Sequence, residues 1–188
     1  MFQTRWMNHF SRVKWFIPIL IVLPLMAWEI VTNYPYSDSW ILPIAFFMVG
    51  MFIWSFTEYV FHRYLFHFNN HKAWSERMHF VLHGIHHDYP NDHLRLVMPP
   101  VMSLTIIGIS FLVSLLFGAY WWCAHSGYIF GYLIYDLIHY SIHHASWQWS
   151  WFKKLKRHHA QHHYQDEHVN YGVSSSLWDH VFGTKMKK

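Results

Sequence analysis

Histidine is the residue type that dominates the chemistry available to this 188-residue chain, in which it occurs 19 times. Ten of the histidines form four groups in the order pair, triplet, pair, triplet, within the segments HRYLFH, HGIHH, HYSIH and HAQHH. Imidazole binds iron, zinc, copper and nickel, so we predict that these groups bind metal. The candidate ligands are His62 and His67; His83, His86 and His87; His139 and His143; and His159, His162 and His163.

The spacing of these histidines predicts a shared site for two ions. Residues i, i+3 and i+4 share one face of a helix, so each triplet can present three rings in one direction, and His139 and His143 are likewise four residues apart. His62 and His67 are five residues apart, about 140° around a helix, and converge only if the helix ends between them. Because one ion takes about four to six ligands, we predict two ions with about five imidazoles each.

Other interpretations of the histidines stay open. A structural zinc site uses about four ligands, which leaves most of the ten unexplained, and a transporter would place its ligands near the middle of the bilayer. A non-catalytic zinc-binding membrane protein is the alternative from another functional class. We expect His79, His144 and His158, which neighbour the triplets, to support or replace ligands. We expect the remaining histidines to be solvated surface residues: His9, His71, His93, His125, His168 and His180.

Two carboxylates share helical faces with candidate ligands. Asp136 precedes His139 by three residues, and Glu58 precedes His62 by four. An unpaired charge near a membrane is costly, so we predict that each carboxylate accepts the ring N–H that its histidine does not use for metal and thereby orients the ring. The alternative is that each is an acid exposed to water at the membrane surface.

The composition predicts contact with lipid. Hydrophobic residues make up 53% of the chain and charged residues only 13%, against about 25% charged residues in a typical soluble domain. So little charge cannot cover a water-facing surface, which indicates that lipid covers part of it. The single cysteine, Cys123, excludes an internal disulfide and a cysteine-based zinc or iron–sulfur site within the chain.

Three stretches without charged residues, 15–28, 39–57 and 96–135, are candidate membrane segments. As one helix the third would be about 60 Å long, twice the roughly 30 Å of a bilayer core. We therefore predict that it turns near residues 118–127 and crosses twice. The sequence predicts an all-α integral membrane protein with four transmembrane helices, in a single domain over residues 1–188.

The charges predict the orientation of these helices. Four crossings put the N-terminus, the polar loop 66–95 and the polar tail 145–188 on one side, together with all 14 Lys and Arg residues. The opposite turns, 33–39 and 118–127, contain none. By the positive-inside rule the first side is cytoplasmic, so both termini and a histidine-rich cap holding a dinuclear metal centre are expected there. We expect no nucleic-acid partner.

A metal centre where helices leave the bilayer can receive an alkyl chain from the apolar side and electrons from the aqueous side. Zinc has no redox chemistry, so the oxidation of such a chain requires iron or a similar metal. Four aromatic residues of the second and fourth predicted helices could line an acyl channel, although tryptophan and tyrosine near helix ends also form interfacial belts. They are Trp54, Phe56, Tyr132 and Tyr135.

At these residues the chain resembles the fatty acid hydroxylase and sterol desaturase superfamily, and within it the fatty acid 2-hydroxylase branch. The resemblance covers most of the chain after residue 50. The histidine pattern marks the superfamily, and HGIHHDYPND followed by RLVMPP is more specific to the branch. The segments that carry it are WSFTEYVFHRYLFH, HFVLHGIHHDYPNDHLRLVMPP, GYLIYDLIHYSIHH, LKRHHAQHHY and SSSLWDHVFGT.

The resemblance implies oxygen-dependent insertion of a hydroxyl group at the carbon next to an acyl carbonyl, in a fatty acyl or sphingolipid (ceramide) substrate. It implies that the ten histidines hold two metal ions, iron in function and zinc as a substitute in a purified sample, with dioxygen as co-substrate. A sterol or carotenoid oxidase of the same superfamily is the alternative.

Familiar eukaryotic members of this family carry an N-terminal cytochrome b5 domain, which this sequence lacks. A separate electron donor, cytochrome b5-like or ferredoxin-like, is therefore expected, and this difference slightly favours a bacterial inner membrane over the endoplasmic reticulum. The donor could dock on Lys153, Lys154, Lys156 and Arg157. These residues could equally contact anionic lipid headgroups, at about 1 kcal/mol for each basic residue.

Overall fold

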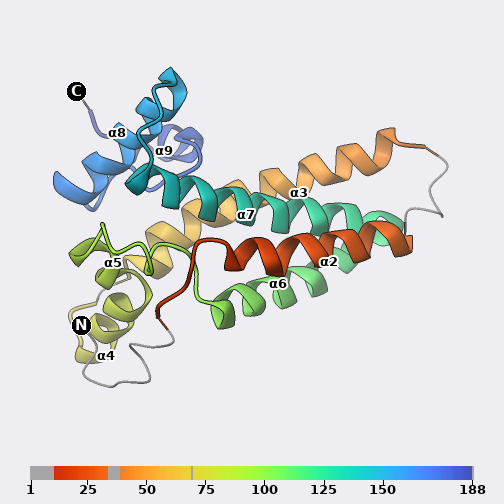
Figure 1. The fold of residues 1–188 in the computed structure, drawn as a ribbon, viewed down its shortest axis with the longest axis horizontal. Helices are drawn as coiled ribbons and strands as arrows, with labels where there is room; N and C mark the ends of the chain where they lie inside the picture. The colour runs from red at the N-terminus through yellow and green to blue at the C-terminus, as the bar shows by residue number, and fades with distance from the viewer. Residues whose placement is uncertain (1–10, 34–38, 69, 188) are drawn as a thin grey trace.

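Four apolar helices lie side by side and form the body of the molecule (Figure 1). The computed structural model describes residues 11–33, 39–68 and 70–187, and the elements in these ranges are all helical. For this part of the chain the all-α prediction is confirmed. The four long helices are α2 (Ile17–Asn33), α3 (Ile41–Val60), α6 (Pro100–Ser114) and α7 (Trp121–His144), and α7 contacts each of the other three.

Two helical segments of the described chain are long and apolar enough to cross a membrane, Ile41–Phe66 and Pro100–His144, and α2 is a shorter apolar helix. The second segment is not one rod. Gly118, in the short helical segment η4 (Leu115–Tyr120), has a φ of 59°, a left-handed conformation that glycine adopts without a steric penalty. The chain reverses there, and α7 returns beside α6 (Figure 1). This is the reversal predicted near residues 118–127.

Helices α3 and α7 pack with their backbones in contact. A Cβ atom on Gly50 would lie 2.0 Å from the Ala124 carbonyl oxygen, and one on Gly127 would lie 2.0 Å from the Phe47 carbonyl oxygen. Helices in a membrane gain little from the hydrophobic effect against each other, so small residues that permit close approach stabilise their packing. The α3–α7 contact fixes the two helices that lead directly into the histidine pairs.

Replacing Gly127 with alanine is expected to destabilise the fold by about 3 kcal/mol or more, because the added methyl group overlaps backbone that cannot move independently. The matched control is Gly108→Ala, since nothing lies within 4 Å of a Cβ at Gly108 in α6 and alanine is the better helix former. Thermal unfolding in detergent should show a lower midpoint for the first variant and an unchanged or higher one for the second. Equal midpoints would contradict the close packing.

Three of the four aromatic residues proposed for an acyl channel pack in the α3–α7 contact. Trp54, Tyr132 and Tyr135 are buried, and the Trp54 ring centroid lies 5.3 Å from that of Tyr132 and 5.8 Å from that of Tyr135. Phe56 is partly exposed and packs on Trp178. The channel prediction is therefore wrong for Trp54 and Tyr132, which hold the two helices together, whereas Tyr135 also lines a cavity of about 60 Å³.

A buried polar cluster joins α2, α6 and α7. His125 Nδ1 contacts Glu29 Oε1, Ser126 Oγ donates to Glu29 Oε2 at 2.6 Å, and His125 Nε2 lies 3.1 Å from the Ile107 carbonyl oxygen. The expectation that His125 is a solvated surface residue is wrong, since 1% of it is exposed. Buried polar groups need partners, and these partners come from two other helices.

The remaining helices gather at one end of the bundle, where α3 and α7 end, and we call this end the cap (Figure 1). Two short π-helical turns, η2 (Phe61–Phe66) and η3 (Phe80–Gly84), also belong to it. The cap brings the loop after α3 and the tail after α7 together, as predicted for the polar segments. Its helices are α4 (Ala73–His79), α5 (Ile85–Asp88), α8 (Ser150–Tyr164) and α9 (Leu177–Val181).

Candidate metal centre

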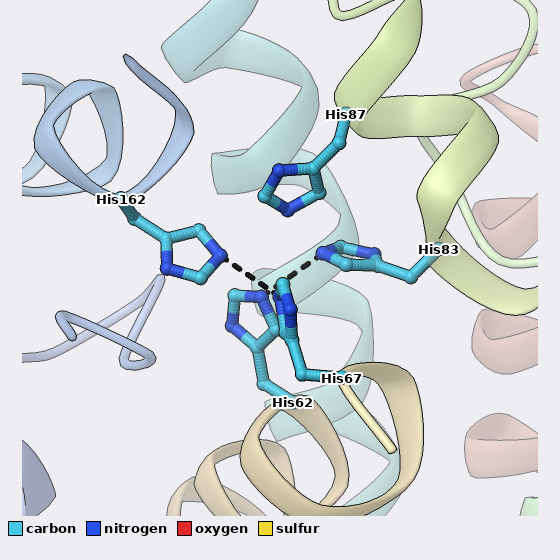
Figure 2. Close-up of side chains that lie close together, drawn as sticks. All are labelled: His62, His67, His83, His87 and His162. Carbon is cyan, nitrogen blue, oxygen red and sulfur yellow. Dashed lines mark hydrogen bonds between the residues drawn. The ribbon is translucent and has the colours of Figure 1, made fainter. Parts of the chain in front are cut away.

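The ten predicted histidines converge in the cap as two groups of five. Within each group, one ring nitrogen from every residue lies within 4.8 Å of the others. Figure 2 shows the rings of the first group pointing toward a common centre from η2, η3, α5 and α8. We call the groups the first nest, which is His62, His67, His83, His87 and His162, and the second nest, which is His86, His139, His143, His159 and His163.

Each triplet is divided between the two nests. His83 and His87 belong to the first nest and His86 to the second, while His159 and His163 belong to the second and His162 to the first. The expectation that a triplet presents all its rings in one direction is wrong. In each triplet the residues at i+3 and i+4 are about 100° apart around the helix axis. The residues at i and i+4 therefore face one nest, and the residue at i+3 faces the other.

The pair His62 and His67 converges because the helix widens rather than ends between them. In the π-helical turn Phe61–Phe66, the His67 N–H donates to the His62 carbonyl oxygen at 3.2 Å. This hydrogen bond joins residues five apart, the spacing that an α-helix would separate. The two imidazole centroids lie 5.1 Å apart, so the π turn brings both rings to the first nest.

The distances between ring nitrogens fit ligands of a single ion in each nest. Nε2 atoms are 3.0 Å apart in the pairs His62–His83 and His67–His162 (Figure 2), and His139 Nε2 is 2.9 Å from His86 Nε2. Two imidazole nitrogens bound at right angles to one ion, each at about 2.1 Å, lie roughly 3.0 Å apart, whereas tetrahedral ligands lie roughly 3.4 Å apart. The nitrogens are thus close enough to bind one ion, and five of them in each nest exceed the four ligands of a structural zinc site.

The hydrogen bonds of the first nest leave lone pairs directed inward. His162 Nδ1 lies 2.7 Å from the Val169 carbonyl oxygen, and His62 Nδ1 contacts the Tyr171 carbonyl oxygen. A carbonyl only accepts, so Nδ1 carries the proton and Nε2 of the neutral ring presents its lone pair to the nest. In the same nest the buried His87 Nε2 has no hydrogen-bond partner among the described residues. A cation at the centre satisfies all of these atoms.

Burial keeps the nest histidines of η3, α5 and α8 neutral. It lowers the pKa of His87 to about 3 and that of His162 to about 4, and it holds the pKa of His83, His86 and His159 well below the usual value, with further lowering by neighbouring histidines in most cases. Neutral imidazole is the form that binds a metal ion. The ligands are therefore ready to bind metal at neutral pH without first losing protons.

Glu58 acts on the first nest through a loop rather than through direct contact. It accepts hydrogen bonds from the backbone N–H groups of Val173 at 2.7 Å and Ser174 at 2.8 Å, and from the Ser174 hydroxyl. The His62 ring N–H faces the Tyr171 carbonyl instead. The prediction that Glu58 accepts this N–H is therefore wrong, although the carboxylate holds the segment that does.

Asp179 holds the same loop from the other side. It accepts from the backbone N–H groups of Tyr171 at 2.9 Å and Gly172 at 2.8 Å, from the Thr184 hydroxyl at 2.8 Å and from His158 Nε2 at 3.0 Å. Burial raises the pKa of Asp179, but these hydrogen bonds outweigh it and keep the pKa below its usual value. The side chain is therefore a carboxylate at neutral pH.

Sequence reasoning missed Asp179, because it lies 17 positions beyond His162 and shares no helical face with a ligand. His158, which pairs with Asp179, was expected to support ligands and does so indirectly. His79 is a further supporting residue, since its Nδ1 lies 2.6 Å from the Phe66 carbonyl oxygen. His144 lies outside both nests. His71, His93, His168 and His180 are exposed as expected, and His9 lies outside the described residues.

Asp136 is buried beside the second nest but does not pair with His139 as predicted. Its carboxylate accepts the Met98 backbone N–H at 3.2 Å. Asp136 thus fixes the entry to α6 against α7. It also lines a cavity of about 60 Å³ together with His83, His86 and His139, so this cavity touches ligands of both nests. Its other walls include the apolar side chains of Leu82, Met98 and Met102.

Comparison with known proteins agrees with this arrangement. Residues 47–184 match the family described as Fatty acid hydroxylase. The chain is 34% identical over 195 residues to dihydroceramide fatty acyl 2-hydroxylase FAH1 of Arabidopsis thaliana, covering 97% of this chain and 78% of the relative. It is 36% identical over 183 residues to ceramide very long chain fatty acid hydroxylase scs7 of Schizosaccharomyces pombe, covering 93% of this chain and about half (52%) of the relative.

A solved structure shares the fold. The structure titled "Full length scs7p (only hydroxylase domain visible)" superposes with a TM-score of 0.87 at 32% sequence identity, covering 97% of this chain and 70% of that chain. The family match covers well over half of the chain, and the sequence resemblance is confirmed. The chain belongs to the fatty acid hydroxylase family.

Proposed function

We propose that the protein hydroxylates the carbon next to the carbonyl of a fatty acyl chain, carried as a fatty acid or in a ceramide. The observation that carries the proposal is the pair of five-histidine nests opening on one cavity with apolar walls. The names of both relatives support the substrate class, and the name of the Arabidopsis thaliana relative, a dihydroceramide fatty acyl 2-hydroxylase, supports the position.

The overall reaction balances with dioxygen as oxidant and an external reductant. One C–H bond becomes C–OH, the second oxygen atom leaves as water, and two electrons and two protons are consumed. A pair of iron ions held by the nests would supply the activation of dioxygen, for which zinc is unsuited because it has no redox chemistry. Zinc bound to purified protein would be a substitute.

The residues of the chain orient the ligands and the substrate. The loop carbonyls of Val169 and Tyr171 fix the protons of His162 and His62 on Nδ1 and direct Nε2 inward. Leu82 and Met102, in the wall of the 60 Å³ cavity, exclude water from the side through which an acyl chain approaches. Asp136 fixes Met98 in the same wall.

We further propose that α2, α3, α6 and α7 are four membrane crossings and that the cap faces the cytoplasm, as the positive-inside rule predicts. A separate electron donor, cytochrome b5-like or ferredoxin-like, would dock on the basic residues of α8. Lys153, Lys154 and Arg157 are exposed there, whereas Lys156 donates to the Ala145 carbonyl oxygen at 2.9 Å. The slight preference for a bacterial inner membrane gains no support from the named relatives, which are eukaryotic.

The proposal predicts that purified, iron-loaded protein in liposomes, supplied with a chemical reductant and ¹⁸O-labelled dioxygen, places one labelled oxygen on carbon 2 of a ceramide acyl chain. Mass spectrometry of the released fatty acid locates the label. Parallel incubations with a sterol and a carotenoid test the alternative oxidases. Labelled sterol or carotenoid without labelled ceramide would contradict the proposal, as would tight zinc binding with no turnover under iron-replete, reducing conditions.

A further inference from the structure

An apolar groove runs along α6 between that helix, α3 and α7. It encloses a cavity of about 210 Å³, larger than the cavity at the nests. Gly50 of α3 and Ala124 of α7 form part of its floor, where the two backbones are in contact. The groove is open toward the outside of the bundle, since Ile109 and Val113 are more than half exposed. Its apolar walls include Ile53, Phe61, Ile106, Ile109, Val113 and Phe117.

The groove begins close to the cavity at the nests. On α6, Met102 lines the cavity at the nests, and Ile106, one helical turn further, lines the groove. On the opposite side, Phe66 lines the cavity at the nests and Phe61 lines the groove, with the two ring centroids 6.4 Å apart. The two spaces share no lining residue, and these four side chains lie between them.

The distance from the cavity at the nests to Val113 in the groove corresponds to a long stretch of hydrocarbon chain. From Met102 to Val113 the helix rises about 16 Å, at about 1.5 Å for each residue. This is roughly half of the 30 Å hydrocarbon thickness of a bilayer. A hydrocarbon chain that runs from Met102 to Val113 therefore spans about the thickness of one leaflet.

We propose that this groove holds the distal part of the acyl chain that is hydroxylated, and that Ile109 and Val113 determine the longest chain the enzyme accepts. The inference rests on the proposed function. Bilayer lipid is as apolar as these side chains, so the groove gains little from transfer of the chain out of the membrane. Selection must then come from the space available: a side chain that fills the groove excludes long chains and leaves short ones unaffected.

The activity test uses Ile109→Trp and Val113→Trp, with Leu112→Trp as the matched control. Leu112 lies at the same depth on α6, is 65% exposed and is not part of the groove wall. Liposomes carry equal amounts of palmitoyl ceramide and lignoceroyl ceramide. We expect the groove variants to lower turnover of the lignoceroyl substrate about tenfold relative to the palmitoyl substrate, the size typical of steric discrimination in apolar pockets. The control should keep the wild-type ratio.

The converse variants, Ile109→Ala and Val113→Ala, widen the groove and should raise the same ratio. They keep the inference testable if a tryptophan variant fails to fold, which size-exclusion chromatography and metal content would reveal. Unchanged ratios in folded groove variants of both kinds would overturn the inference and indicate a groove filled by bulk lipid. Absence of hydroxylated product from the wild type would instead contradict the proposed function.

A measurement without turnover tests the groove directly. A very-long-chain ceramide with a diazirine at the terminal carbon is photolysed with wild-type protein in liposomes. We expect fragmentation of the labelled peptides to locate the label on Ile109 and Val113, and labelling to be reduced by unlabelled ceramide but not by phosphatidylcholine. Labelling spread over the lipid-facing side of α6, including Leu104 and Leu112, and equally reduced by both lipids, would overturn the inference.

Discussion

Removing two ligands from one nest is expected to remove one metal ion of two and to abolish activity. The double variant His83→Ala/His87→Ala truncates the first nest, and His159→Ala/His163→Ala truncates the second. Each removes a pair four residues apart from one triplet, so the two variants are matched in position and chemistry. Three imidazoles then remain in the truncated nest and five in the other.

The physical reason for this expectation is that each nest has its own centre. Loss of ligand-supporting residues alone typically costs 10–100-fold in metal affinity or activity, and loss of two ligands should cost more than about a hundredfold. Elemental analysis of purified protein should give two metals per chain in the wild type and one in each double variant. His168→Ala, which changes an exposed histidine of the cap, should keep both. Loss of both metals in either double variant would indicate one shared centre.

The second large effect is expected from Asp179→Asn. The amide keeps the size of the carboxylate but removes its charge, and its NH₂ group would face donors in place of one acceptor oxygen. The amides of Tyr171 and Gly172 and the ring of His158 would lose a charged partner. The loop that presents carbonyls to His62 and His162 would then be poorly held, and we expect the metal affinity of the first nest to fall about 10–100-fold.

A chelator titration distinguishes this positioning role from general destabilisation. In the Asp179→Asn protein, the metal of the first nest should be lost at a lower chelator concentration than in the wild type. The metal of the second nest should be lost at the wild-type concentration. Glu58→Gln should act in the same direction, because it holds the other end of the loop. The control is Asp166→Asn, at an exposed position. Equal weakening of both metals would assign Asp179 to the stability of the fold alone.

The candidate ligands could be identified from sequence because histidine is a specific residue type and each group is local. Four short segments carried the whole set: each pair follows the end of an apolar stretch, and each triplet lies in the polar segment that comes next. Their division between nests could not be predicted from spacing. It depends on how η3 and α8 face each other across the centre, and a single helix pattern does not contain that relation.

The partners of the buried carboxylates also lay beyond sequence reasoning. Glu58 binds the backbone of residues more than a hundred positions away, and Glu29 pairs with His125, which is 96 positions away. Backbone N–H groups leave no trace in the sequence, because every residue except proline has one. From the sequence, Glu58 and Asp136 could therefore be paired only with nearby histidines on the same helical face. Both of these pairings are wrong. The four-helix pattern was easier to predict, since apolar length and the position of Gly118 are local properties.

The most direct test of two separate ions is an anomalous difference map recorded at the iron absorption edge from crystals of iron-loaded protein. We expect two peaks in each chain, one among the Nε2 atoms of His62, His67 and His162 and the other among those of His139, His143 and His159. A single peak, or peaks outside the cap, would contradict it.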